Sequence, residues 1–221
     1  MTLARTRRRR PRKTYHHGNL PPALVAVAKT LIIERGLDGF TLREVARRVG
    51  VTHVAAYRHY ADRRALLAAV SESGFRQLHG RLERARRRAS PSLAPRLRSV
   101  LAAYLHFCWD ERALAALMFG PRLSHGGEFP ELEAAVFATL GPIEDTIASL
   151  APEASRRGRS ARDLALALWT FVHGFSTLAY DKAAYPTAAR AARAFDDMLT
   201  PMLAGMFGAG SRAGGKRTAR R

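Results

Sequence analysis

The side chains best suited to chemistry gather in one short stretch, residues 41–60, and the chemistry they suit is hydrogen bonding to nucleic acid. Thr41 and Arg43 lie near its start, and His53 and Tyr57 lie in its second half. A guanidinium group pairs with O6 and N7 of guanine, while hydroxyl and imidazole groups bond to phosphates or base edges. This combination of residue types indicates a DNA-contacting surface.

Catalytic and metal-binding chemistry is not indicated. His106 and Cys108 lie only two positions apart, so on a helix they do not face the same way, and no Cys/His pair has zinc-finger spacing. The sequence has no glycine-rich phosphate loop, no Gly-x-Ser-x-Gly motif and no carboxylate cluster of the metal-binding kind. We therefore expect no metal, no cofactor and no enzymatic activity.

Two short helices joined by a tight turn would position the polar residues of this stretch. Thr41 and Glu44 form a capping box for the first helix, and Gly50 permits the turn. Thr52 caps the second helix, which is expected to end near Tyr60. Such a pair projects its second helix into a DNA major groove. The alternative is an ordinary helical hairpin inside a bundle.

The positive charge is unevenly distributed along the chain, whose net charge is +19. Residues 1–110 carry 23 basic and 7 acidic side chains (+16), residues 111–200 carry 9 and 11 (−2), and residues 201–221 add 5 basic ones (+5). The first half therefore favours a polyanionic partner such as DNA. A solvated surface, or a general preference for Arg (33) over Lys (4), would give the same numbers.

The hydrophobic periodicity predicts an all-α chain of about nine helices, with a three-helix helix-turn-helix DNA-binding domain before a larger helical domain. A regulatory and dimerisation role for the larger domain is what the resemblance of the chain to a known family implies. The expected boundaries are a basic flexible tail (1–18), the DNA-binding domain (19–62), the ligand-binding and dimerisation domain (63–208) and a second basic tail (209–221). After the first helix, which ends at Gly36, helices are expected over residues 42–49, 52–60, 62–88, 96–111, 113–119, 131–150, 160–182 and 188–207. Without a long apolar run or a signal stretch, we expect a cytoplasmic protein that does not enter a membrane.

Residues 15–70 resemble the DNA-binding domain of the TetR family of regulators. The resemblance lies in the stretches Tyr15-His16-His17-Gly18-Asn19-Leu20, Glu34-Arg35-Gly36, Thr41-Leu42-Arg43-Glu44-Val45-Ala46, Gly50-Val51-Thr52-His53, Tyr57-Arg58-His59-Tyr60 and Leu66-Leu67-Ala68-Ala69-Val70. It implies that Thr41, Tyr57 and Arg63 hold phosphates, and that Arg43, His53, Val54 and Ala55 approach base edges. Thr52, Arg58 and His59 complete the expected DNA-binding set.

The C-terminal half is similar to one subgroup of that family, whose regulatory domain carries a Trp-x-x-x-His-Gly signature, here Trp169 to Gly174. The resemblance implies a homodimer formed by the last two helices, each of which has an apolar stripe. The stripes are Leu164, Leu168, Phe171, Phe175 and Leu178 on one helix, and Phe195, Met198, Leu199, Met202 and Met206 on the other. The alternative is that both stripes only complete the subunit's own core.

A mainly apolar small-molecule effector is expected in the regulatory domain, because residues 111–200 are near neutral and rich in large apolar side chains. The candidate ligand-binding residues are Tyr104, Phe107, Cys108, Met118, Phe119, Phe137, Trp169 and His173. Trp169 and His173 lie four apart and share a helix face. For these two residues packing, with the imidazole hydrogen-bonded to a neighbour, is favoured over direct ligand contact.

Together these features predict a sequence-specific DNA-binding transcriptional regulator, a ligand-responsive repressor that binds a palindromic operator as a dimer. Repression is what the resemblance implies. The alternative is a sequence-independent DNA-coating protein that relies on its basic tails.

Overall fold

The computed structural model describes residues 20–120, 123, 127–151, 158–179 and 184–207, and no strand occurs in these ranges. The two basic tails and Asn19 lie outside them. In chain order the helices are α1 (Leu20–Arg35), α2 (Leu42–Val49), α3 (His53–Tyr57), α4 (Arg63–Arg88), α5 (Leu93–Asp110), α6 (Arg112–Met118), α7 (Pro130–Ala138), α8 (Gly141–Leu150), α10 (Ala161–Leu178) and α11 (Ala188–Phe207). The predicted all-α class, with an N-terminal helix-turn-helix and a larger helical domain, is confirmed.

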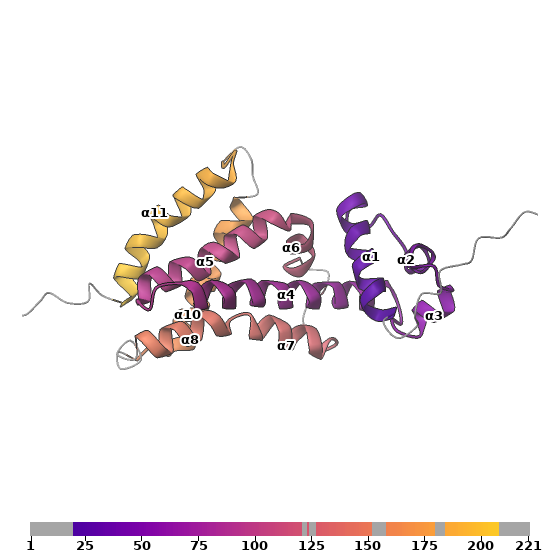
Figure 1. Cartoon of the computed structure of the whole chain (residues 1–221), viewed down its shortest axis with the longest axis horizontal. Helices are drawn as coiled ribbons and strands as arrows, with labels where there is room; N and C mark the ends of the chain where they lie inside the picture. Colours follow the sequence, from indigo (N-terminus) through magenta and orange to yellow (C-terminus); the bar gives the residue numbers. More distant parts are fainter. Residues whose placement is uncertain (1–19, 121–122, 124–126, 152–157, 180–183, 208–221) are drawn as a thin grey trace, which may run out of the picture.

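The long helix α4 is the axis of the molecule (Figure 1). Its 26 residues span about 39 Å. Its N-terminal end packs against α1, which in turn contacts α2 and α3. The rest of its length packs against α5, α6, α7 and α8. The buried stripe of α4 includes Leu66, Val70, Phe75, Leu78 and Leu82, so one continuous helix joins both parts of the chain.

Close packing between α4 and α6 depends on a glycine. A Cβ atom at Gly74 would lie 2.5 Å from the Sδ atom of Met118, so a larger residue would displace the Met118 side chain. The α4–α6 contact therefore fixes where Met118 lies in the C-terminal domain.

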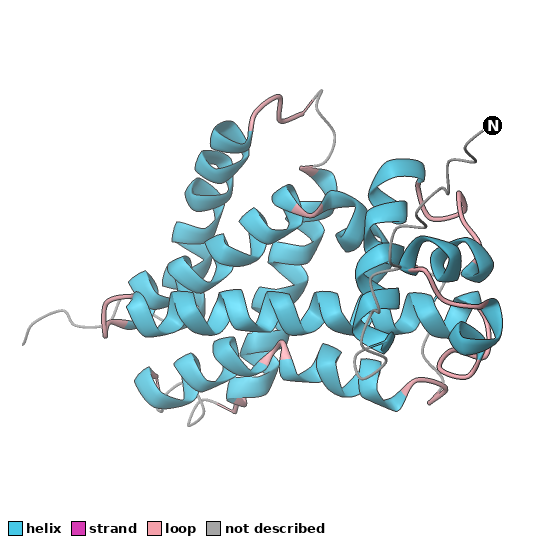
Figure 2. Cartoon of the chain, turned by 45° about the vertical axis from the view of Figure 1, so that its right-hand side comes forward, coloured by secondary structure: helices cyan, strands magenta, loops and turns pink. Residues whose placement is uncertain are grey.

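The last two helices pack differently from the rest. Helix α10 contacts α5 and α8, whereas α11 contacts α5 and diverges from α4 in both views (Figures 1 and 2). Arg98 of α5 holds α11 through an ion pair with Asp196 and a 2.7 Å hydrogen bond to the Thr200 hydroxyl. Phe195 of α11 packs on Phe171 and Phe175 of α10, with ring centroids 5.4 and 5.2 Å apart.

Several predicted helix boundaries were wrong. The single helix expected over residues 131–150 is two helices, α7 and α8, because Pro142 has no backbone N–H to continue the first one. Helix α5 begins at Leu93 rather than 96, since Pro95 is tolerated in a first turn. Helix α3 ends at Tyr57, earlier than expected. No helix within the described ranges is long and apolar enough to cross a membrane.

Candidate nucleic-acid interface and ligand cavity

Local hydrogen bonds fix the geometry of α2, α3 and their turn. The Thr41 hydroxyl accepts from the Glu44 N–H at 3.2 Å, and the Thr52 hydroxyl accepts from the Ala55 N–H at 3.3 Å. Gly50 ends α2 with a φ of 87°, a left-handed conformation that favours glycine. The Glu44 carboxylate, expected to complete a capping box, instead accepts a 2.8 Å hydrogen bond from Arg35.

Helix α3 has one buried residue and an exposed outer face. Ala56 is fully buried against the core that includes Leu42 and Val45 of α2. The predicted DNA-binding residues lie on the other side, where Thr52, His53, Val54, Tyr57, Arg58 and His59 are exposed and Ala55 is half-buried. The apolar side chain of Val54 is 51% accessible and is available for contact with a partner.

Arg43 of α2 belongs to the same surface. A shallow depression is lined by Arg43, Arg47, Gly50, Val51, Thr52, His53 and Val54. Among the described residues, Arg43 and Arg58 have no acidic partner, whereas Arg35 and Arg48 are paired with Glu44 and Glu34. The guanidinium groups of Arg43 and Arg58 are therefore available to an external acceptor.

Arg63 lies in a different environment from the other predicted DNA-binding residues. Its guanidinium packs over the Phe40 ring at 5.0 Å and lies 3.6 Å from the Asp38 carboxylate. Its Nε and Nη2 atoms are buried without a hydrogen-bond partner. A phosphate contact by Arg63 stays a prediction, and its side chain is 31% exposed.

Much of the positive charge of the first half lies far from α3. Arg84, Arg86, Arg87 and Arg88 are at the C-terminal end of α4, at the opposite end of the molecule from α2 and α3 (Figure 1). Glu83 accepts hydrogen bonds from Arg86 and Arg87, which lower the pKa of that carboxyl to about 2. The net charge of residues 1–110 is therefore not a measure of the charge on the α2–α3 surface.

The predicted ligand-binding residues fall into two groups, one packed in the core around Tyr104 and the other, Met118 and Phe137, at the wall of a cavity. Tyr104, Phe107 and Cys108 are buried in the core, and Phe119, Trp169 and His173 pack around Tyr104. The Trp169 Nε1–H donates to the Tyr104 hydroxyl at 3.2 Å, and that hydroxyl lies 3.2 Å from His173 Nδ1. Because an indole only donates, the Tyr104 hydroxyl accepts from Trp169, and its contact with His173 is compatible with donation to Nδ1 of a neutral imidazole. This geometry favours packing as the role of Trp169 and His173.

Acidification is expected to destabilise the fold through His173. Burial lowers the pKa of this imidazole below its ordinary 6.5, so the unfolded chain binds the proton more readily than the folded one. His173 therefore imposes no penalty well above pH 6.5, and stability falls as the pH drops through 6.5 toward the lowered pKa. Each unit of lowering corresponds to about 1.4 kcal/mol.

The measurement is urea unfolding of the wild type and of His173→Gln, which keeps an acceptor for Tyr104, at pH 7.5 and 5.5. We expect the wild type to lose more stability than the variant over this interval. Equal losses in the two proteins would show that protonation of His173 does not matter to the fold.

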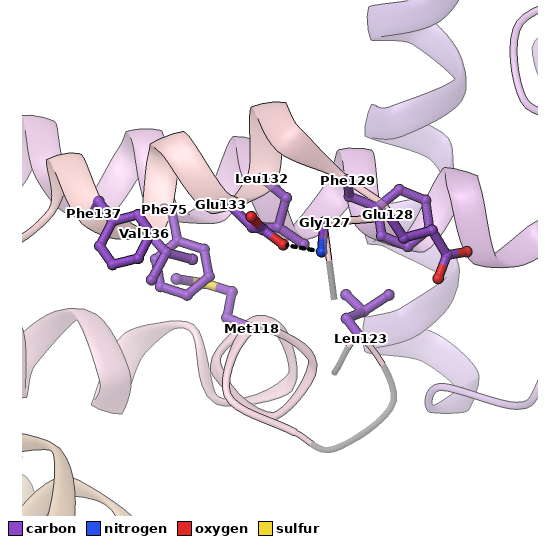
Figure 3. A pocket seen from close by; sticks show the side chains of 10 residues that line it. All are labelled: Phe75, Met118, Leu123, Gly127, Glu128, Phe129, Leu132, Glu133, Val136 and Phe137. Carbon is purple, nitrogen blue, oxygen red and sulfur yellow. Dashed lines mark hydrogen bonds between the residues drawn. The ribbon is translucent and has the colours of Figure 1, made fainter. Parts of the chain in front are cut away.

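A cavity of about 320 Å³ lies beside this cluster, between α4, α6 and α7 (Figure 3). Its lining is Phe75, Met118, Leu123, Gly127, Glu128, Phe129, Leu132, Glu133, Val136 and Phe137. Of the predicted ligand-binding residues only Met118 and Phe137 take part. The remaining lining comes from Phe75 of α4 and from residues within 123–136, which precede and form α7.

The charged groups at the cavity wall already have partners. The Glu133 carboxylate accepts a 2.8 Å hydrogen bond from the Gly127 N–H (Figure 3). The Glu128 carboxylate is paired with Arg64 of α4 at 2.5 Å. The described part of the chain shows no group of three or more His, Cys, Asp or Glu residues placed to hold a metal ion. The geometry therefore suits an apolar ligand.

Two family models match the chain. Residues 24–70 match the bacterial regulatory proteins of the tetR family, and residues 97–202 match the tetracyclin repressor-like C-terminal domain. The tetracycline repressor protein class A of Escherichia coli (transposon 1721) is 39% identical over 59 residues, 27% of each chain. The chain spans only 27% to 45% of the length of the curated tetracycline repressors it matches.

Solved structures extend the likeness to most of the chain. A protein of unknown function from Rhodococcus sp. RHA1 is 32% identical, with a TM-score of 0.70, over 86% of this chain and 98% of that one. The regulator FadR of Bacillus subtilis, solved in complex with stearoyl-CoA, has a TM-score of 0.63 over 80% of this chain and 96% of that one, but at 13% identity it shows the fold alone. With the helix-turn-helix, the regulatory domain and both family matches in agreement, the chain belongs to the TetR family of bacterial regulatory proteins.

Proposed function

We propose that this protein is a sequence-specific DNA-binding transcriptional repressor that acts as a homodimer and responds to a mainly apolar small molecule. The observation that carries the proposal is the surface formed by α2 and α3. There, Arg43 of α2 and Arg58, which have no acidic partner among the described residues, lie with exposed His53, Val54 and Tyr57 of α3, a helix capped by Thr52. Exposed polar groups on a capped helix suit readout of a major groove.

The roles of the individual side chains follow from their places on this surface. Arg43, His53, Val54 and Ala55 lie toward the turn and would approach base edges. Thr41, Thr52, Tyr57, Arg58 and His59 would bond to the flanking phosphates, as would Arg63. In this assignment residues 19–62 form the DNA-binding domain, and residues 63–208 form the ligand-binding and dimerisation domain.

Dimerisation through α10 and α11 is supported by the side chains that these helices leave uncovered. The predicted stripes are divided, since Leu164, Leu168, Phe175, Phe195 and Leu199 are buried in the subunit itself. Leu178 (70% accessible) and Met198 (41%) remain exposed and line one groove with Thr170, Gly174 and Thr177. A second copy related by two-fold symmetry would cover this groove and present two α3 helices to DNA.

Selection of bound DNA from a random library tests the function. We expect a palindromic site whose half-sites are about one helical turn, ~34 Å, apart. The competing function, a sequence-independent DNA-coating protein, predicts no enriched sequence. Enrichment of a single, non-repeated half-site would contradict the dimeric part of the proposal while leaving specific binding intact.

The basic N-terminal segment is expected to add affinity without changing the preferred site. Each phosphate neutralised by Arg7–Arg10 and their neighbours adds about −0.9 to the slope of log K against log salt. Removal of residues 1–13 should therefore flatten the slope by several units when operator affinity is titrated from 50 to 300 mM salt. A control lacking residues 212–221 removes five basic residues from the other terminus. If the slope is the same without residues 1–13, that segment does not contact DNA.

A further inference from the structure

The cavity between α4, α6 and α7 has a wall that reaches the DNA-binding domain. Glu128 and Phe129, two adjacent residues of its lining, both contact Arg64. The Arg64 guanidinium is paired with the Glu128 carboxylate and packs over the Phe129 ring at 5.4 Å. Arg64 is the second residue of α4. Asp62, two positions before it, caps that helix by accepting a 2.7 Å hydrogen bond from the Ala65 N–H. The cavity wall is thus tied to the first turn of the helix that follows α3.

The lining also restricts what the cavity can hold. Seven of the ten lining residues are apolar, namely Phe75, Met118, Leu123, Phe129, Leu132, Val136 and Phe137. The charged lining residues are the two carboxylates Glu128 and Glu133. Arg64, the positive partner of Glu128, is not itself part of the lining. A carboxylate or phosphate on a ligand would lose hydration and face the Glu133 carboxylate, which has no cationic partner among the described residues. The cavity volume, about 320 Å³, is at the small end of ligand sites.

Resting on the function proposed above, we propose that this cavity is the effector site, that it takes a compact apolar molecule without negative charge, and that the Arg64 contacts with Glu128 and Phe129 transmit its occupancy to the DNA-binding domain. A ligand lying against Phe129 displaces the wall that holds Arg64. The first turn of α4 then shifts, and the spacing of the two α3 helices changes with it. Ligand and DNA therefore favour different positions of Arg64, and the binding of each weakens the binding of the other.

The binding part is tested with the uncharged fluorescent probe N-phenyl-1-naphthylamine and three competitors of equal chain length, octanol, octylamine and octanoate. We expect the probe to bind, octanol and octylamine to displace it, and octanoate to be at least about tenfold weaker than octanol. Val136→Trp, which fills the cavity, should abolish probe binding, whereas Ala134→Trp, on the exposed side of α7, should not. Circular dichroism melting checks that both variants fold. Failure of the probe to bind, or octanoate binding as tightly as octanol, overturns the site or its ligand class.

The coupling part is tested by measuring probe affinity with and without the DNA site selected from the random library. In the wild type we expect bound DNA to weaken the probe at least fivefold. In Arg64→Gln, whose side chain is outside the cavity lining, the effect should fall below twofold, with probe affinity of the free protein unchanged. Arg76→Gln, which breaks the exposed Arg76–Glu72 pair on α4, is the matched control and should behave as the wild type.

The outcomes separate this inference from the function on which it rests. If no DNA sequence is selected, the proposed function fails, and the probe measurements still decide the cavity and its ligand class. If DNA is bound specifically but leaves probe affinity unchanged, or if Arg64→Gln retains the wild-type coupling, the role of Arg64 is wrong while the function stands.

Discussion

The double variant Leu178→Glu, Met198→Glu is expected to be a folded monomer with operator affinity at least about 100-fold below that of the wild type. Both side chains are exposed in the isolated subunit, so the substitutions leave its core intact. In the dimer they would bury four carboxylates in an apolar interface, which is strongly unfavourable. A monomer binds only one half-site. It loses the gain in affinity, typically 10²–10⁴-fold, that comes from binding the second half-site within the same complex.

Sedimentation at micromolar concentration and titration of the selected DNA site measure the two effects. Ala134→Glu, Ala138→Glu is a matched control, because both alanines are exposed on α7, away from α10 and α11. The buried residues of the two stripes are unsuitable for this test. Phe195, for example, is 2% accessible, and a charge there would disrupt the subunit itself. A wild type that sediments as a monomer, or a double variant that stays dimeric, contradicts the proposed interface.

Arg43→Ala is expected to relax sequence preference at one position of each half-site. Its guanidinium is exposed on the α2–α3 surface and has no acidic partner among the described residues. A two-pronged contact with guanine contributes about 1–3 kcal/mol of discrimination. Since a dimer uses two such contacts, the loss of affinity for the best site should exceed tenfold, with a much smaller loss for sites that carry another base there.

The measurement compares the affinities of the variant and the wild type for the selected site. The same comparison is made for DNA that carries each of the other three bases at each position of the site. Arg76→Ala serves as control, since Arg76 is paired with Glu72 on α4 and should leave the profile unchanged. If Arg43→Ala weakens binding to all sequences by the same factor, Arg43 contacts phosphate, and the residues of α3 read the bases.

The helix-turn-helix was predictable because its signals are local. Thr41, Gly50, Thr52 and Asp62 act within three or four positions of themselves, through caps and a left-handed turn. The exposed face of α3 followed from the same periodicity, and each residue assigned to it apart from half-buried Ala55 is exposed. The break between α7 and α8 did not follow from periodicity, because the apolar pattern continues through residues 131–150, whereas Pro142 cannot continue the hydrogen bonding of α7.

The charges and the cavity depended on contacts between distant segments. A net charge over residues 1–110 does not reveal that α4 carries its last arginines about 39 Å from its first. Arg63 had the residue type of a phosphate contact, and only the tertiary structure shows that it packs over Phe40.

By itself, then, the sequence determined the all-α class, the caps and turn of the DNA-binding domain, and the face that α3 presents, because each depends on neighbours along the chain. Tertiary structure decided which aromatic residues fill the core and which enclose space. Tyr104, Trp169 and His173 satisfy one another's polar atoms, whereas Phe75, Met118, Phe129 and Val136 meet across a gap between three helices. The physical reason is that periodicity tells which side of a helix is apolar, but only the packing of the helices tells whether the facing side chains meet.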